Sequence, residues 1–157
     1  MTARAGAGSP GHPLRLAELS APTFSGELAR DGGVRTFMPT ILFVEDDEGV
    51  RESTAATLAL NGFRLLVAQN GYEAMRLFAQ EPVDVLFTDV VMPGLNGIEL
   101  AKQARELLPD LKVLFMTAYY SRAAEAEELG KLLFKPVRDV QIVAALTELL
   151  AAQSTRP

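Results

Sequence analysis

The sequence contains no cysteine, a single histidine and no long apolar run. The absence of cysteine excludes disulfides, thiolate metal sites and cysteine nucleophiles, and it fits a reducing compartment. No apolar stretch is long enough to span a membrane, and none near the N-terminus is long enough for a signal peptide. An excess of basic residues is lacking too: the net charge is −5, which argues against nucleic acid or a membrane surface as the main partner. We therefore expect a cytoplasmic protein.

The 157 residues, 48% of them hydrophobic, are enough for one globular domain with a substantial core. Residues 1–37 differ from the rest because they hold half of the glycines, interspersed with prolines. We expect them to form a mobile N-terminal extension, followed by a folded domain over 38–152 and a short tail over 153–157. An alternative is that Met38 is the natural start of the protein.

From residue 40 onward, strand-like and helix-like patterns alternate. The expected strands cover 41–44, 63–68, 84–88, 112–116 and 132–134, and the expected helices cover 49–60, 71–80, 97–108, 121–129 and 138–151. Leu108 and Val140 are among the residues expected on the buried helix faces. Such alternation predicts parallel strands with right-handed crossovers. The sequence thus predicts a flavodoxin-like α/β fold, a (βα)5 doubly wound parallel sheet with strand order 2-1-3-4-5.

Acidic residues follow two strands that this order makes neighbours. Glu45 and Asp46 end the first strand, and Asp89 ends the third, at the edge where doubly wound sheets bind ligands. Two unit charges ~4 Å apart repel by about 4 kcal/mol at an effective dielectric constant of ~20, so the cluster needs a neutralising partner. Hard oxygen ligands without histidine or cysteine indicate Mg²⁺. A turn-initiating Asp or a solvated acidic face is the simpler alternative, and it accounts for Asp47 and Glu48 only.

A hydroxyl and an ammonium group reach the same edge. Thr117 follows the fourth strand, and Lys135 follows the fifth. Taken singly, each is most simply an ordinary strand-end or surface residue. Together with three carboxylates they indicate a site that handles a phosphoryl group, with a cation, a lysine and a hydrogen-bond donor. Three acids and one lysine leave a charge of −2, which one divalent ion would balance.

Four motifs in this order, VEDDE, FTDVVMPGLNG, FMTAY and FKPV, resemble those of a response-regulator receiver domain of two-component signalling. The resemblance covers residues 40 to about 150. It implies that Thr117 and Lys135 contact the phosphoryl group. The segment Phe115 to Tyr119 is also similar to the Phe-x-Thr-Gly-Tyr subgroup, mostly stand-alone receivers, and to the receivers of hybrid kinases.

The resemblance also implies the chemistry of the acids. Asp89 would be the phosphoacceptor, Asp46 a direct Mg²⁺ ligand, Glu45 a second ligand that often acts through water, and the backbone carbonyl of Val91 a further ligand. The phosphoryl donor would be a phosphohistidine of a sensor histidine kinase or a histidine-phosphotransfer protein. It must come from another protein, because the one histidine of this chain is His12, in the N-terminal extension.

The chain departs from the family pattern in three places. Leu132 stands where receivers often carry an aromatic switch residue, and Tyr119 or Tyr120 could take over that part. The distance from Thr117 to Lys135 is short, so the helix over 121–129 should be short or loose. Val91 is apolar where some relatives have a polar residue that assists water, which predicts slow loss of the phosphoryl group.

The sequence shows no second domain after residue 151, and the leading interpretation is a stand-alone receiver that acts through protein contacts. Its downstream partner is not readable from the sequence, and a homodimer through the fourth and fifth helices is a further expectation. It would not be an enzyme beyond gaining and losing its own phosphoryl group. Two alternatives are a Mg²⁺-dependent phosphatase with Asp89 as nucleophile, and a receiver-like module that binds without phosphorylation.

Overall fold

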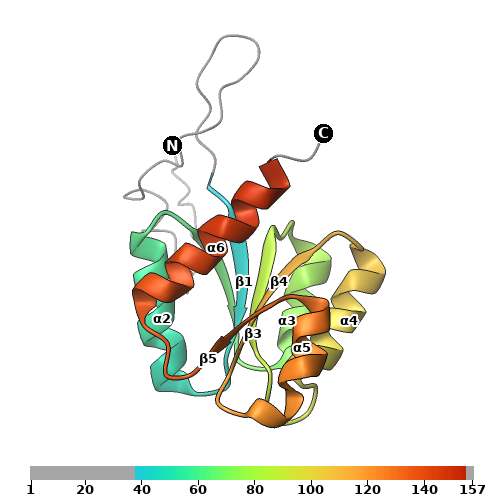
Figure 1. The fold of residues 1–157 in the computed structure, drawn as a ribbon. Helices are drawn as coiled ribbons and strands as arrows, with labels where there is room; N and C mark the ends of the chain where they lie inside the picture. Colours follow the sequence, from blue (N-terminus) through green and yellow to red (C-terminus); the bar gives the residue numbers. More distant parts are fainter. Residues whose placement is uncertain (1–37, 155–157) are drawn as a thin grey trace, which may run out of the picture.

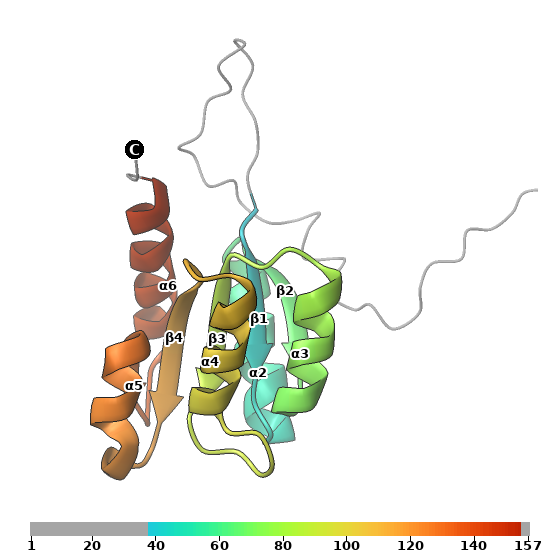
Figure 2. The same cartoon turned by 90° about the vertical axis from the view of Figure 1, so that its right-hand side faces the viewer.

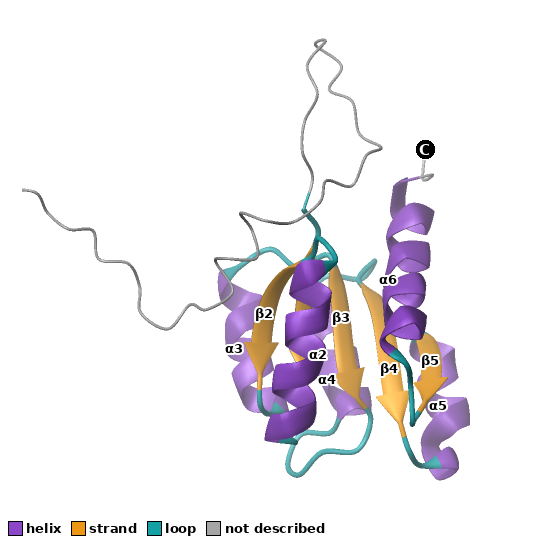
Figure 3. Cartoon of the chain, turned by 90° about the vertical axis from the view of Figure 1, so that its left-hand side faces the viewer, coloured by secondary structure: helices purple, strands orange, loops and turns teal. Residues whose placement is uncertain are grey.

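The computed structural model describes residues 38–154. In this range, five parallel strands form one sheet in the order β2-β1-β3-β4-β5. Helices α2 and α6 cover one face of the sheet, and α3, α4 and α5 cover the other (Figures 1, 2 and 3). The predicted flavodoxin-like fold and strand order are confirmed.

The elements alternate along the chain, as the sequence pattern predicts. The strands are β1 (Thr40–Val44), β2 (Arg64–Ala68), β3 (Val85–Asp89), β4 (Lys112–Thr117) and β5 (Lys131–Phe134). The helices are α2 (Glu48–Leu60), α3 (Gly71–Gln80), α4 (Gly97–Leu107), the short 3₁₀ helix η1 (Tyr120–Arg122), α5 (Ala123–Leu129) and α6 (Asp139–Ser154).

Three helices that follow the carboxyl end of a strand begin with a side-chain cap. Asp47, Asn70 and Asn96 precede α2, α3 and α4, and each side chain accepts a backbone N–H hydrogen bond from three residues on, at 2.8 to 2.9 Å. Such caps satisfy donors that the first turn of a helix leaves unpaired. They fix where the loops at this edge of the sheet turn into helices.

Strand residues alternate between two cores, one on each face of the sheet. Leu42 and Val44 of β1 pack under α3, α4 and α5, whereas Ile41 and Phe43 pack under α2 and α6. Phe43 also stacks on Phe87 of the neighbouring strand β3, with ring centroids 4.8 Å apart. Because both faces are covered, the interiors of the central strands are continuous apolar runs, and polar residues stand only at or next to their ends.

The expected helix over 121–129 is the element that differs most from the sequence pattern. It begins as the 3₁₀ turn η1, and the α-helix α5 has only seven residues, so the expectation of a short helix is confirmed. Two predicted core positions are wrong: Leu108 and Val140 are exposed. Leu108 has left the helical conformation as the C-cap of α4, and Val140 lies in the first turn of α6, where Ile142 is buried instead.

The predicted N-terminal extension, residues 1–37, and residues 155–157 of the predicted tail lie outside the described residues. Among the helices that are described, none has the length and apolar character needed to cross a membrane.

Candidate functional site

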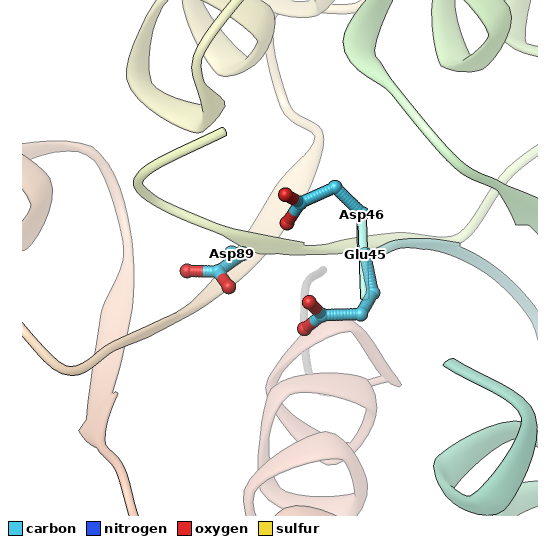
Figure 4. A group of neighbouring side chains, drawn as sticks. All are labelled: Glu45, Asp46 and Asp89. Carbon is cyan, nitrogen blue, oxygen red and sulfur yellow. The ribbon is translucent and has the colours of Figure 1, made fainter. Parts of the chain in front are cut away.

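Three carboxylates meet at the carboxyl edge of the sheet. Glu45 and Asp46 directly follow β1, and Asp89 is the last residue of β3, which pairs with β1 through Val44 and Thr88. One oxygen from each carboxylate lies within 4.8 Å of the others. Figure 4 shows the Glu45 and Asp46 side chains leaving the end of β1 on the side where Asp89 lies. The predicted convergence of the acids is therefore present in the structure.

Lys135, which follows β5, reaches into this cluster. Its Nζ lies 2.7 Å from Asp89 Oδ2 and 3.4 Å from Glu45 Oε1. Glu45 and Asp89 are buried, with 1% and 8% of their side chains exposed, and Asp46 is exposed. The site thus combines two buried acids, one acid open to solvent and a half-buried lysine.

Burial and neighbouring charges change the proton affinity of two groups. Burial raises the pKa of Glu45, and the negative charge of Asp89 raises it further. The hydrogen bond from the Asp47 backbone N–H and the positive charge of Lys135 lower this pKa, but they do not cancel the increase. Burial lowers the pKa of Lys135, but its hydrogen bond and attraction to Asp89, with a smaller contribution from Glu45, outweigh burial and leave the pKa raised. Lys135 therefore remains a cation at neutral pH, and ionisation of Glu45 is less favourable than that of a glutamate in water.

Thr117 ends β4 between the acids and Lys135. Its hydroxyl accepts a hydrogen bond from the Tyr119 N–H at 3.0 Å and lies 3.4 Å from the Tyr119 carbonyl oxygen. The Lys135 backbone N–H donates to the Thr117 carbonyl at 2.8 Å. The predicted phosphoryl-binding pair is thus joined through the backbone, and the Thr117 hydroxyl is engaged by the loop that follows it.

The three candidate switch residues lie in different surroundings. Leu132 is partly buried against the core beneath α5. Tyr119 and Tyr120 are both exposed, and the Tyr120 ring stacks on Phe134 with centroids 4.4 Å apart and planes 21° apart. Tyr120 is therefore the tyrosine in ring contact with the strand that leads to Lys135.

Val91 lies beside the candidate phosphoacceptor, two residues after it. Its backbone N–H points to Asp89 Oδ1 at 3.4 Å, and 43% of the residue is exposed. An apolar residue that is partly open to solvent therefore lies next to Asp89.

Two contributors were not predicted from the sequence. Arg51, in the first turn of α2, donates from Nη1 to the Glu45 carbonyl at 2.9 Å. Gly97 begins α4, and a Cβ atom there would overlap the backbone carbonyl of Asp89. The glycine after the turn motif could have been recognised as a close-packing position, whereas Arg51 carried no signal that distinguishes it from a surface residue.

The structure is a doubly wound sheet with an acidic cluster and a lysine at the edge where such sheets bind ligands, which is the arrangement expected of a receiver-like domain. The family model for the response regulator receiver domain matches residues 41–147. The chain belongs to this family, as the four sequence motifs indicated.

Individual relatives agree with this assignment. The chain is 35% identical over 119 residues to the response regulator receiver protein CpdR of Brucella abortus, covering 73% of this chain and 99% of CpdR. It is 44% identical over 78 residues to the response regulator MprA of Mycolicibacterium vanbaalenii, but this match covers 50% of the chain and only 34% of MprA. A CheY-like receiver structure from Methanospirillum hungatei superposes with a TM-score of 0.71 at 25% identity, covering 75% of this chain and 98% of that one.

Proposed function

We propose that this receiver accepts a phosphoryl group on Asp89 from a phosphohistidine of a sensor histidine kinase or histidine-phosphotransfer protein. The observation that carries the proposal is the contact of Lys135 Nζ with Asp89 Oδ2 at 2.7 Å, beside two further carboxylates. An ordinary surface carboxylate is not expected to be buried in contact with a lysine and beside two further carboxylates. The family membership and the match to almost the full length of CpdR support the same function.

The chain's own residues account for the transfer. A carboxylate oxygen of Asp89 attacks the phosphorus, the P–N bond of the donor breaks, and its electron pair stays on the imidazole nitrogen. Lys135, already paired with Asp89, is placed to hold a phosphoryl oxygen of the acyl phosphate that forms. The hydroxyl of Thr117 would leave its contacts with Tyr119 to donate to another oxygen.

The donor set fits Mg²⁺, because it consists of carboxylate oxygens without nitrogen or sulfur ligands. We propose Asp46, Asp89 and Glu45 as the protein side chains that hold the ion, with the backbone carbonyl of Val91 as a further ligand. When bound, Mg²⁺ would neutralise the acids and stabilise the negative charge on the transferring group.

The phosphorylated form would signal through protein contacts. A hydrogen bond from the Thr117 hydroxyl to the phosphoryl group would change the contact of Thr117 with the loop that carries Tyr119 and Tyr120. The Tyr120 ring stacks on Phe134, the residue before Lys135. Both phosphoryl-binding residues are therefore linked to the start of η1 and α5. We propose the surface formed by α5, β5 and α6 as the one that changes, whether its partner is a downstream protein or a second copy of this chain.

The test is the intact mass of the purified protein after incubation with Mg²⁺ and acetyl phosphate. We expect a gain of one phosphoryl group in the wild type, no gain in Asp89→Asn, and no gain when the metal is chelated. A gain that persists in Asp89→Asn would assign the acceptor elsewhere. Turnover of a generic phosphate ester would instead favour a phosphatase, and Mg²⁺ binding without any gain in mass would favour a module that binds without phosphorylation.

A further inference from the structure

Arg51 reaches back from the first turn of α2 to the end of β1. Its Nη1 donates a hydrogen bond of 2.9 Å to the carbonyl oxygen of Glu45. This carbonyl belongs to the peptide group that joins Glu45 to Asp46, the two consecutive acids of the site. Arg51 as a whole is half-buried.

In the described part of the chain, the other hydrogen bonds at the end of β1 are made by Glu45 and not by Asp46. The Glu45 backbone N–H donates to the Ala68 carbonyl at 3.1 Å, and its carboxylate accepts from the Asp47 N–H at 3.1 Å and from Lys135 at 3.4 Å. The Asp46 side chain is exposed, and within residues 38–154 it has no hydrogen bond of its own. The direction of its carboxylate therefore depends on how its backbone is held.

We propose that Arg51 is a positioning residue that holds the Glu45–Asp46 peptide so that the Asp46 carboxylate faces the metal site. The inference rests on the proposed function, because it assigns Asp46 as a Mg²⁺ ligand. Groups that orient metal ligands commonly change metal affinity by about 10- to 100-fold when they are removed.

The charge of Arg51 would act in the opposite direction. A guanidinium bonded to the Glu45 carbonyl lies near the metal site and repels a divalent cation, so charge alone predicts tighter Mg²⁺ binding when Arg51 is neutralised. Positioning predicts weaker binding. The two effects differ in sign, which makes the role of Arg51 measurable.

The experiment compares Mg²⁺ affinity, by calorimetric titration without any phosphodonor, in the wild type, Arg51→Met and Arg76→Met. Arg76 is exposed on α3, so its replacement makes the same change in net charge away from this contact. We expect Arg51→Met to bind Mg²⁺ about 10-fold more weakly and Arg76→Met to match the wild type. Equal or tighter binding by Arg51→Met would overturn the proposal.

A second measurement needs no metal. Arg51 donates to the Glu45 carbonyl, and the nitrogen of that same peptide group belongs to Asp46. Arg51→Met should therefore shift the Asp46 amide resonance in the metal-free protein. If Arg51→Met does not fold, Arg51→Lys keeps the charge with a shorter reach, and unchanged Mg²⁺ affinity in it would overturn the proposal. Failure of the wild type to bind Mg²⁺ would reject the proposed function, and the role of Arg51 with it.

Discussion

Glu45 holds a carboxylate in the protein interior, with 1% of its side chain exposed and Asp89 beside it. Burial raises the pKa of Glu45 above its ordinary value of 4.5. A carboxyl group whose pKa is raised by folding stabilises the folded state fully below pH 4.5, and this contribution is lost as the pH rises through the folded-state pKa. In the metal-free protein Glu45 thus favours the folded state less at neutral pH than at low pH.

Replacing Glu45 with Gln should remove the loss of folding stability that accompanies ionisation of Glu45. In the presence of a chelator, we expect the Glu45→Gln variant to gain stability relative to the wild type as the pH is raised from 4 to 7. Urea unfolding at both pH values measures the difference. Glu52→Gln, at an exposed position of α2, is the matched control and should show no such gain. Parallel pH dependence in Glu45→Gln and the wild type would contradict the prediction.

Val91 should control how long the phosphoryl group stays on Asp89. An apolar side chain cannot orient a water molecule for attack on the acyl phosphate, so a Val91→Asn variant should lose the group several-fold faster. The decay of the phosphorylated mass after removal of the donor gives the rate. Val91→Ala separates the two causes, because it opens the site without adding a polar group; equally fast decay in Ala and Asn would mean that access alone sets the rate.

At the scale of elements, the packing of α4 against the end of β3 depends on a single glycine. A Cβ atom at Gly97 would overlap the Asp89 carbonyl, whereas one at Gly49 in α2 would meet only Asp47 Oδ1, at an ordinary 3.5 Å. We expect Gly97→Ala to lose about 1–3 kcal/mol of stability through forced backbone shifts. Gly49→Ala should gain about 0.5–1 kcal/mol, because alanine favours a helix. Denaturant unfolding of both variants tests this, and equal effects would contradict it.

Helix α5 contributes few side chains to the hydrophobic core of the domain. Ala126 is its one fully buried residue, and Glu125 pairs with Arg122 at 2.8 Å and with Lys102 of α4 at 3.7 Å. Exposed ion pairs contribute little, and seven residues are too few for a helix to be stable alone. The amides of α5 should therefore exchange with solvent faster than those of α4 in native-state hydrogen exchange. Equal protection of the two helices would show that α5 is not a separately mobile element.

At the scale of the whole molecule, the three acids come together only because the sheet pairs β1 with β3. The unfolded chain does not have this arrangement, so Mg²⁺ should bind the folded protein and raise its melting temperature. At a free Mg²⁺ concentration of 100 times Kd, the gain would be about 2.7 kcal/mol. Asp46→Asn, at an exposed position, should lose most of the effect. An equal shift in NaCl of matched ionic strength would show general screening instead.

Most of the fold could be predicted because its signals are local. Each strand is a continuous apolar run that ends in polar residues, and parallel pairing then brings Asp46, Asp89 and Lys135 to one edge of the sheet. Helix ends were less predictable. Leu108 continues the apolar period of α4 in the sequence, yet the helix has already ended there.

Contacts between side chains that are far apart in the sequence, and hydrogen bonds of single polar side chains, could not be predicted from the sequence pattern. The stacking of Tyr120 on Phe134 depends on how η1 turns after β4, which the sequence pattern read as plain helix. The bond from Arg51 to the Glu45 carbonyl depends on the exact angle at which α2 leaves β1. Periodicity identifies the faces of elements but not the hydrogen bonds of single side chains.

The positions of the tyrosines give the molecule an optical property. The chain has no tryptophan and three tyrosines, Tyr72, Tyr119 and Tyr120. Tyr72 is the second residue of α3, in the turn that follows β2, and the other two follow β4, so all three lie toward the same edge of the sheet as the acids, and all are exposed. The tyrosine fluorescence of the protein, excited at wavelengths where phenylalanine does not absorb, therefore originates from this edge of the sheet, and an unlabelled sample can report events there without a signal from the core.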